Sequence, residues 1–458
     1  MLKKKYSRRE FLRDAAGVAG LFHIIPASAL GRNGRTPPSD RIGVGCIGLG
    51  GQGTYNMRAF LAQPDVQLTG LCDVNSGSDD YDMLYQFTGS SSAGLSHALR
   101  RAVAFSEELG RPLDKDGIFC CRDFRELLIR PDVDAVCVCT PDHWHGLISI
   151  AAAGAGKDIY CEKPLVNSIA EGRALCGVVG RHGRILQTGS HERSNDSIRF
   201  AWELVQNGRI GRLKEIIVHM PSRDPHHLKM LEKENPIRAL RVPVYLDYDL
   251  WLGPAAWSPY APERCFFWWR FILEYGGGEM TDRGAHILDL AQFMNRADET
   301  GPVEIRAEGK RIGAGLYDSF LEYRFECRYS NGVLLRGSSE GERGLRLNGT
   351  DGSIFIAIHG GQLTADPPGL LSETFSPGEI KAGRSPGHHR DFLNAVRSRR
   401  QPVAPAEAGH RTATLCHLIN AAMILNRPLR WDPEKETVQG DDEALRLILK
   451  PMRPPWRI

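Results

Sequence analysis

The sequence predicts an α/β protein that begins with a Rossmann-type, doubly wound parallel sheet and continues into a second domain. A glycine-rich turn joins a buried strand to a helix at Gly48, as in the first step of a dinucleotide-binding sheet. Strand-like and helix-like segments then alternate as far as residue 166, which favours parallel pairing through right-handed crossovers. Because 458 residues exceed one ordinary hydrophobic core, we expect the rest of the chain to form further structure.

The first residues have the order of a secretory signal. Basic residues 3–5 precede Ser7-Arg8-Arg9-Glu10-Phe11-Leu12, a weakly apolar stretch over residues 15–25, and the small residues 27–29. The paired arginines resemble a twin-arginine signal, which exports proteins already folded. We therefore expect residues 1–29 to direct export to the periplasm and residues 1–39 to be signal and linker. The alternative is a disordered basic arm.

The cysteine pattern agrees with export after folding. The chain has eleven cysteines and no C-x-x-C pair, so it signals neither a zinc site nor a redox motif. An odd number of thiols is awkward for the ordinary secretory route but no obstacle to a protein that folds first in the reducing cytoplasm.

Composition argues against two classes of partner. The net charge is +3, with 42% hydrophobic and 25% charged residues, as in a soluble globular protein. No basic stripe with interleaved aromatic residues occurs, so we expect no nucleic-acid partner. The body of the chain has no apolar run long enough to span a bilayer, so we expect no integral membrane segment after signal removal.

A dinucleotide site is predicted where the first strand ends. Residues 41–49 read as a short buried strand and lead through a G-x-G-x-x-G turn into a helix over residues 54–62. Gly48 permits the tight turn, Gly50 lets the backbone approach the pyrophosphate, and Gly53 lets helix pack on strand. The pyrophosphate is expected at the helix N-terminus. Gln52, which lies within this turn, is counted among the cofactor-binding residues.

Asp73 indicates which nicotinamide cofactor the site would bind. The second strand, residues 66–72, ends at this acid, which is placed to accept hydrogen bonds from the ribose hydroxyls. A carboxylate repels a 2′-phosphate, so we expect NAD, with NADP possible. The alternative is that the glycine-rich turn has no cofactor role and that Asp73 is a solvated loop residue.

The first domain is expected to span residues 40–166. A long insertion, residues 76–117, replaces the usual short connection, and a helix is expected over residues 122–130. The strand over residues 133–139 ends in Thr140-Pro141 and is followed by a helix over residues 148–155. The next strand, residues 157–161, ends in Glu162-Lys163-Pro164.

Four motifs in this order resemble the Gfo/Idh/MocA oxidoreductases, the family of glucose–fructose oxidoreductase and inositol dehydrogenase. They are the Gly48 turn, Thr140-Pro141 with His145, Glu162-Lys163-Pro164, and Gly276-Gly277-Gly278 followed by Asp282, His286 and Asp289. The resemblance implies cofactor contacts from Thr140, Pro141, His145, Glu162 and Lys163.

The resemblance also implies an α+β domain over residues 167–430, built on a large, open, mostly antiparallel sheet, with a tail over residues 431–458. Five segments read as its strands: residues 213–220, 303–308, 319–327, 333–337 and 354–358. In the family this sheet often builds oligomers, so the resemblance implies a dimer or tetramer.

Three residues are the candidate catalytic and substrate-binding groups. Oxidising a secondary alcohol requires a hydride acceptor, a proton acceptor, and a group that steadies the developing alkoxide. Lys163, at a strand end, suits the last two roles. Asp282 and His286 share one helix face at i, i+4, and an Asp beside a His favours the imidazolium. The resemblance implies that His286 is the base and Asp282 its partner. The alternative is that Asp282 is an ordinary acid at a helix start and that His286 is packed in the interior.

Other candidates rest on weaker patterns. Arg193 follows a strand over residues 185–188 and is predicted to contact substrate hydroxyls; the alternative is a solvated loop. Arg270 lies within an aromatic cluster and is predicted to contact the sugar ring; the alternative is that this cluster belongs to the core. Asp282 and His286 could also ligate a metal with His143 and His145, but no third ligand stands at a metal-like spacing, so no metal is expected.

Three functions are compatible with these residues. The first is an NAD(P)-dependent oxidoreductase acting on a hydroxyl of a sugar, glycoside or polyol. The second is a redox glycosidase or lyase that cleaves glycosides through a transient keto-sugar. The third is a non-catalytic nucleotide-binding protein, against which Lys163, Asp282 and His286 argue. Because free NAD is scarce outside the cytoplasm, export predicts a tightly held dinucleotide.

Overall fold

The computed structural model describes residues 36–81, 90–222, 224–232, 238–313, 315–358 and 362–458. The signal expected over residues 1–29 lies outside the described residues. None of the described helices combines the length and apolar character needed to cross a bilayer.

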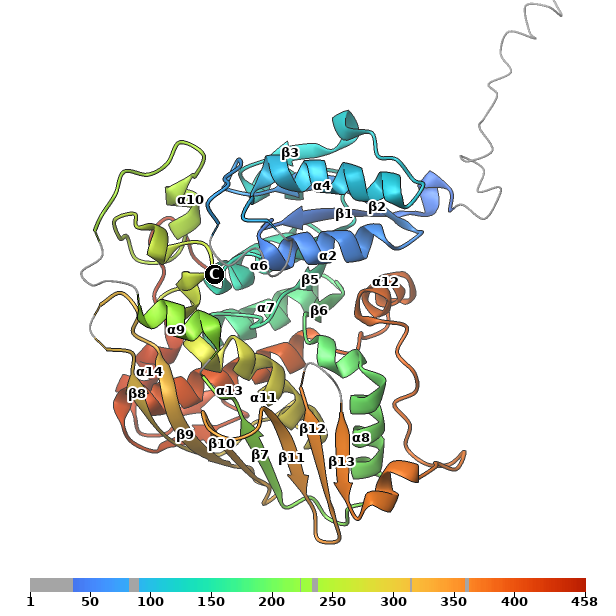
Figure 1. The fold of residues 1–458 in the computed structure, drawn as a ribbon, viewed down its shortest axis with the longest axis vertical. Coiled ribbons are helices and arrows are strands. Elements are labelled where there is room, and N and C mark those ends of the chain that lie inside the picture. The colour runs from blue at the N-terminus through green and yellow to red at the C-terminus, as the bar shows by residue number, and fades with distance from the viewer. Residues whose placement is uncertain (1–35, 82–89, 223, 233–237, 314, 359–361) are drawn as a thin grey trace, which may run out of the picture.

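The first unit is a six-stranded sheet in the order β3-β2-β1-β4-β5-β6, with every pair parallel (Figure 1). Its strands are β1 (Ile42–Ile47), β2 (Val66–Cys72), β3 (Phe119–Cys121), β4 (Ala135–Val138), β5 (Asp158–Cys161) and β6 (Leu186–Thr188). The central strands β1, β4 and β5 are buried throughout, because helices cover both faces. The strand order reverses between β1 and β4, and such a switch point opens a ligand crevice at the carboxyl ends of the strands. The predicted doubly wound fold is confirmed.

The helices of this unit are α2 (Gly51–Leu61), α4 (Leu95–Glu108), α5 (Phe124–Leu128), α6 (Asp142–Gly154) and α7 (Ile169–Arg181). Helix α6 begins at Asp142, ahead of the predicted residue 148, because Pro141 (φ −58°) caps it and fixes the backbone for a helix start. The sheet also takes in β6, so the Rossmann unit continues beyond the boundary predicted at residue 166.

The second unit is a nine-stranded sheet in the order β13-β12-β11-β7-β10-β9-β8-β14-β15. Its strands are β7 (Glu215–His219), β8 (Glu304–Arg311), β9 (Phe320–Arg328), β10 (Leu334–Ser338), β11 (Gly344–Asn348), β12 (Ser353–Ala357), β13 (Leu363–Asp366), β14 (Leu429–Asp432) and β15 (Thr437–Val438). Only β7 and β10 pair in parallel, so the sheet is mostly antiparallel, as expected. The five predicted strands are present; the sequence analysis missed the short strands β11, β13, β14 and β15.

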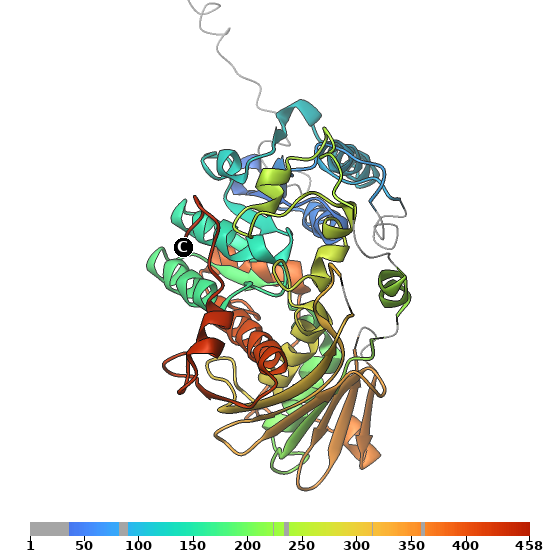
Figure 2. The same ribbon diagram turned by 90° about the vertical axis from the view of Figure 1, so that its left-hand side faces the viewer.

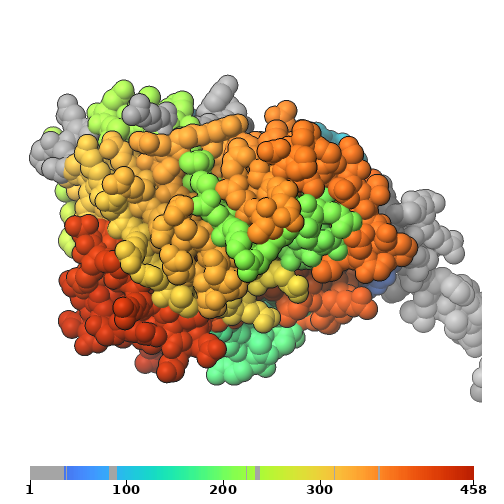
Figure 3. Space-filling view, turned by 90° about the horizontal axis from the view of Figure 1, so that it is seen from below, coloured from blue at the N-terminus to red at the C-terminus, as the bar shows by residue number. Residues whose placement is uncertain are grey.

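Helices cover one face of this sheet and leave the other open. The helices of the unit are α8 (Asp196–Gln206), α9 (Pro225–Leu231), α10 (Tyr248–Leu252), α11 (Arg283–Met294), α13 (Ala406–Leu425) and α14 (Asp442–Leu449). Helices α11 and α13 share a hydrophobic core with the strands, and Figure 2 shows α13, in red, on one side of the curved sheet. Figure 3 looks onto this end of the molecule from below, where green residues lie among the yellow and orange residues that follow them in the chain. Exposed ion pairs such as Arg306–Glu304 and Arg336–Glu326 line the open face.

Helix α12 (His388–Ser398) returns from the second unit and completes the core of the first. Phe392 is fully buried, with ring centroids 5.9 Å from both Phe60 and Tyr160. Arg390 pairs with Asp65 at 2.6 Å on the surface of the same contact. A segment near the end of the chain therefore stabilises the sheet formed near its beginning.

We expect Phe392→Ala to lower the free energy of unfolding by about 3–5 kcal/mol, the usual cost of truncating a buried aromatic side chain. Denaturant unfolding of the wild type, this variant and the exposed control Arg400→Ala measures the difference. A loss below about 1 kcal/mol would show that α12 does not belong to the Rossmann core.

Candidate active site

A cavity of about 690 Å³ lies between the carboxyl ends of the parallel strands and the second unit. Its lining includes nearly all the predicted site residues: Gly48, Gly50, Gln52, Asp73, Thr140, Pro141, His145, Glu162, Lys163, Arg270, Asp282 and His286. The second unit contributes the aromatic segment after α10, the start of α11, and Arg343. The cavity therefore lies where two domains meet, the usual place for a cofactor and its substrate.

The glycine turn needs its glycines for packing as well as for conformation. Gly48 has φ +84°, and a Cβ there would lie 2.6 Å from the carbonyl oxygen of Cys139. A Cβ on Gly53 would lie 1.9 Å from the carbonyl oxygen of Gly48, so only glycine lets α2 pack this closely. Gly50 and Gly51, at the start of α2, line the cavity and present a helix N-terminus to it.

Asp73, directly after β2, stabilises this turn through hydrogen bonds to backbone amides. Its Oδ2 accepts a hydrogen bond from the Leu49 amide at 2.6 Å, and its Oδ1 accepts one from the Asn75 amide at 2.8 Å. Burial raises the pKa of Asp73 to about 6, against the lowering effect of these two bonds. The ribose contact remains a prediction.

Buried Glu162 and half-buried Gln52 form a polar group in the wall of the cavity. Glu162 Oε1 accepts hydrogen bonds from Asn56 Nδ2 at 2.8 Å and Gln52 Nε2 at 3.2 Å, and His191 Nε2 lies 3.4 Å away. Burial opposes ionisation, yet His191, Asn56 and Lys163 together hold the pKa of Glu162 well below its usual range. Glu162 is therefore a fixed negative charge beside Lys163.

His145 connects the two strand ends that carry the motifs. Its Nδ1 lies 2.7 Å from the Pro164 carbonyl oxygen and its Nε2 lies 2.8 Å from the Thr140 carbonyl oxygen. Burial lowers the pKa of this ring. His145 thus positions the segment that bears Lys163.

Lys163 and Asp282 join the two units at the centre of the cavity. Lys163 Nζ donates to Asp282 Oδ1 at 2.7 Å and to the Asp282 carbonyl oxygen at 3.0 Å. Arg270 Nε lies 3.6 Å from the same carboxylate. Although burial opposes ionisation, these cations hold the pKa of Asp282 well below its usual range. The i, i+4 spacing with His286 did not reveal these two partners, because Lys163 comes from the other unit and Arg270 from the segment before the glycine turn.

Arg193 is a correction to the sequence analysis. It was predicted to contact substrate, but its side chain is fully buried away from the cavity lining. Its guanidinium donates to Asp289 at 2.7 and 2.8 Å and to Asp298 at 2.8 Å. Because Arg193 and Asp289 are both buried and Asp298 approaches from the surface, Arg193 has a structural role linking the segment after β6 to α11.

Asp142 is a cavity residue that the sequence analysis missed. It is the first residue of α6, is buried, and lies with Oδ2 3.4 Å from Thr281 Oγ1. Burial raises its pKa to about 8, although Lys163 and Arg270 oppose this. Asp142 is therefore a neutral acid at pH 7 on the cavity wall. The sequence signal that could have identified Asp142 as a cavity residue is its position directly after Thr140-Pro141, at the carboxyl end of a strand.

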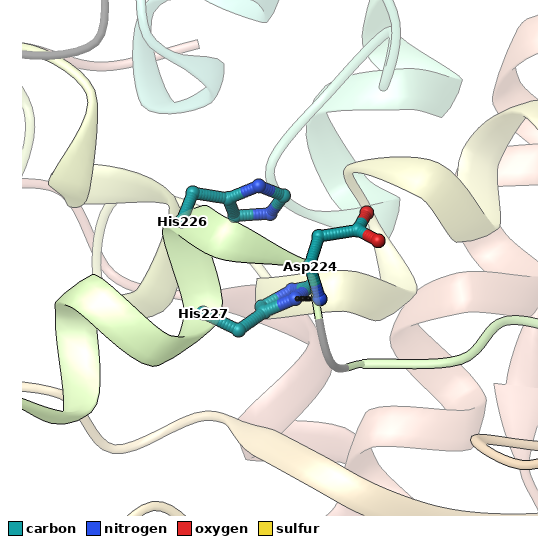
Figure 4. A group of neighbouring side chains, drawn as sticks. All are labelled: Asp224, His226 and His227. Atoms are coloured by element: carbon teal, nitrogen blue, oxygen red, sulfur yellow. Dashed lines mark hydrogen bonds between the residues drawn. The ribbon is translucent and has the colours of Figure 1, made fainter.

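A histidine–aspartate cluster is formed by Asp224, His226 and His227 at the start of α9 (Figure 4), next to two arginines of the cavity lining, Arg283 and Arg343. Polar atoms of Asp224, His226 and His227 lie within 4.8 Å of one another, a spacing compatible with a metal. Their atoms are already engaged: His227 Nε2 lies 2.5 Å from Glu279, and the Arg283 guanidinium pairs with Asp224 and lies 3.2 Å from His226 Nε2. Two arginines, Arg283 and Arg343, therefore pair with Asp224 in this cluster.

These features define a class of protein. The protein combines a parallel sheet that carries a dinucleotide turn with a second domain whose aspartate pairs with a lysine of the first. This combination is typical of two-domain nicotinamide-dependent oxidoreductases. The chain belongs to the Gfo/Idh/MocA oxidoreductase family. Residues 197–458 match its "C-terminal alpha/beta domain" and residues 83–190 its "NAD-binding Rossmann fold".

Several relatives are sugar enzymes. The chain is 26% identical over 325 residues to 1,5-anhydro-D-fructose reductase of Ensifer adhaerens, covering 69% of this chain and 83% of that protein. It is 35% identical over 261 residues to levoglucosan dehydrogenase of Pseudarthrobacter phenanthrenivorans, covering 52% and 56%. It is 29% identical over 180 residues to a glycosyl hydrolase family 109 protein of Saccharopolyspora erythraea, covering 36% and 35%.

A solved levoglucosan dehydrogenase, in complex with NADH and L-sorbose, has the same fold. The TM-score is 0.57 at 18% identity, covering 85% of this chain and 99% of that one.

We expect Asp142→Asn to change how stability depends on pH. Between pH 4 and 8 the unfolded chain has lost the Asp142 proton and the folded protein keeps it, so wild-type stability falls as pH rises. Relative to Asp142→Asn, the loss is at most about 1.4 kcal/mol per pH unit. Denaturant unfolding from pH 5 to pH 9 measures it, with exposed Asp116→Asn as control. Parallel curves for wild type and Asp142→Asn would contradict a neutral Asp142.

Proposed function

We propose that this protein oxidises or reduces a hydroxyl-bearing carbon of a sugar, glycoside or polyol, using NAD held in the Rossmann unit. The observation that carries the proposal is the Lys163–Asp282 pair, which lies in the same cavity as the dinucleotide turn. The family and the sugar substrates of the named relatives support the choice of substrate.

The cavity residues fit a dinucleotide. The N-terminus of α2 offers free amides to a pyrophosphate, glycines keep that surface clear of side chains, and Asp73 places a carboxylate at the end of β2. NAD, when bound, supplies the hydride acceptor.

The chain's own residues handle the proton and the charge. Lys163 Nζ, fixed by Asp282, is placed to stabilise an alkoxide as the substrate C–H bond breaks. His286, on the same cavity wall, takes the hydroxyl proton, so that the alcohol loses one hydride and one proton and becomes a carbonyl. Asp282 acts as an ionised partner that keeps Lys163 in place.

Export in the folded state and retention of the cofactor are further parts of the proposal. Contacts between the segment after β2 and the second unit support retention of the cofactor. The Asp247 amide donates to the Val74 carbonyl at 3.0 Å, and the ring centroids of Tyr81 and Phe266 lie 5.0 Å apart. Both residues of the ring pair line the cavity, so this contact is placed to slow the exchange of a bound cofactor. All eleven cysteines are free thiols, which is compatible with folding in the cytoplasm before export.

A second candidate is a redox glycosidase or lyase. The family 109 glycosyl hydrolase relatives favour it. Oxidising a ring hydroxyl acidifies the neighbouring C–H, permits elimination of the glycosidic group, and is then reversed, so NAD returns to its starting state. Net NADH formation supports the dehydrogenase, whereas glycoside cleavage without a net absorbance change supports this alternative.

We expect Lys163→Met and His286→Ala to lower turnover at least about a hundredfold, because each removes proton transfer or alkoxide stabilisation. Turnover is followed as NADH absorbance and as product formation on a panel of sugars and glycosides, and bound dinucleotide is measured separately. The exposed residue Lys435 provides the matched control Lys435→Met. Full activity of either site variant would refute its assigned role.

We expect the purified protein to contain bound dinucleotide. Denaturation followed by mass spectrometry should release close to one NAD per chain, and dialysis should remove little of it. Tyr81→Ala should lose the dinucleotide faster, because the contact with Phe266 is removed. A protein that purifies empty and binds NAD weakly would refute retention.

A further inference from the structure

The side chain of Tyr81 borders the glycine turn of the dinucleotide site. An ideal Cβ built on Gly50 would lie 3.4 Å from the Tyr81 hydroxyl oxygen and 3.8 Å from two carbons of its ring. Apart from the atoms of Leu49 and Gly51, these three atoms are the nearest to that position among the described residues. Tyr81 therefore faces the side of the turn that glycine leaves free of a side chain.

The space beside Gly50 is where a pyrophosphate approaches. The second glycine of a dinucleotide turn lacks a side chain so that the backbone can come close to this group. Helix α2 begins directly after Gly50, without a hydrogen bond from a capping side chain and without an acidic residue in its first turn, so its first amides are left for an anion. A pyrophosphate that contacts Gly50 thus comes within reach of the Tyr81 hydroxyl.

The Tyr81 hydroxyl is available as a hydrogen-bond donor. In the described part of the chain it has no hydrogen-bond partner. Burial raises the pKa of Tyr81 to about 12, although the nearby Arg270 opposes the shift, so the phenol keeps its proton at neutral pH. A protonated phenol donates to an anion, and hydrogen bonds to ionised acceptors are stronger than those between neutral groups.

Phe266 supports the Tyr81 ring from the second unit. The two ring centroids lie 5.0 Å apart, with the ring planes inclined by 58°. Phe266 has φ +53°, in the left-handed region that bulky side chains rarely occupy. Such a conformation persists only where the surrounding structure holds it, and such residues gather at ligand sites. The second unit therefore keeps a strained residue at the point where it meets Tyr81.

Hydrogen bonds place the segment over residues 76–81. The Tyr81 amide donates to the Ser91 carbonyl at 3.0 Å, and the Ser76 amide donates to the Tyr245 carbonyl at 2.8 Å. The Tyr245 hydroxyl in turn donates to Asp80 Oδ2 at 2.9 Å. Backbone contacts in the first unit and a tyrosine of the second thus position the residues that lead to Tyr81.

We propose that Tyr81 is a cofactor-binding residue whose hydroxyl donates a hydrogen bond to the pyrophosphate of the bound dinucleotide, while Phe266 holds its ring beside the glycine turn. This inference rests on the proposed function, and it adds a side chain to the backbone amides that contact the phosphates. Because Tyr81 and Phe266 belong to different units, retention of the dinucleotide depends on the contact between the units as well as on the turn.

A crystal structure of the protein grown with excess NAD tests the contact directly. We expect the Tyr81 hydroxyl oxygen to lie within about 3 Å of a pyrophosphate oxygen, the usual length of an O–H···O hydrogen bond. A hydroxyl that contacts only a ribose, a base or solvent would overturn the inference and leave the proposed function intact. A cavity that binds no dinucleotide would overturn both.

Tyr81→Phe measures the hydroxyl alone, because the ring and its contact with Phe266 remain. Protein loaded with NAD is mixed with isotopically labelled NAD, and the exchange is followed by mass spectrometry. Exchange should be about tenfold to a hundredfold faster in Tyr81→Phe than in the wild type, because a hydrogen bond to a charged acceptor is lost.

Tyr245→Phe is the matched control. It removes a tyrosine hydroxyl that holds the same segment but lies outside the cavity lining, so exchange should change less than about threefold. Equal rates in the wild type and Tyr81→Phe would overturn the inference. Equal acceleration in Tyr81→Phe and Tyr245→Phe would also overturn it, since the effect would then come from loosening the segment.

A double-mutant cycle tests the role of Phe266. In Phe266→Ala the Tyr81 ring loses its support, so adding Tyr81→Phe to this variant should accelerate exchange by less than a further factor of about three. If Tyr81→Phe has its full effect in the Phe266→Ala background, the assigned role of Phe266 is wrong.

Discussion

The contact between Lys163 and Asp282 determines how the two units of this protein work together. Lys163 follows the fifth strand of the Rossmann sheet, and Asp282 caps the helix that begins the active-site wall of the second unit. Both side chains are largely buried, at 15% and 20% exposure, so removing either one would leave the other with a weaker charge balance. This ion pair therefore holds the two units together at the cavity between them.

Around this pair the protein builds support from residues that do not face the substrate. His145 joins the two motif-bearing strand ends through two backbone carbonyls, and Glu162 is held by Asn56 and Gln52 from the glycine-turn helix. Arg193 ties the segment after β6 to α11 through Asp289. Several motif positions that identify the family thus position other groups, which explains why a motif alone does not reveal which of its members touches a ligand.

Local signals predicted the fold well and the site in part. Buried strands separated by helices, and a glycine turn whose glycines are sterically required, are encoded within short stretches, so the parallel sheet was readable in advance. The pairing of Asp282 with Lys163, the burial of Arg193 against Asp289 and the elevated pKa of Asp142 depend on contacts between separate elements of the fold, which no local pattern encodes. Short strands such as β13 and β15 carry too few residues for a periodic pattern, and they form only because neighbouring strands offer free edges.

The return of α12 to the first sheet has a consequence for synthesis of the chain. Phe60 and Tyr160 emerge from the ribosome long before Phe392, so the dinucleotide-binding sheet lacks part of its core until most of the polypeptide has been made. The core of the dinucleotide-binding sheet is therefore completed only after most of the second unit has been synthesised. Until α12 arrives, the aromatic side chains of Phe60 and Tyr160 lack the ring of Phe392 that packs against them.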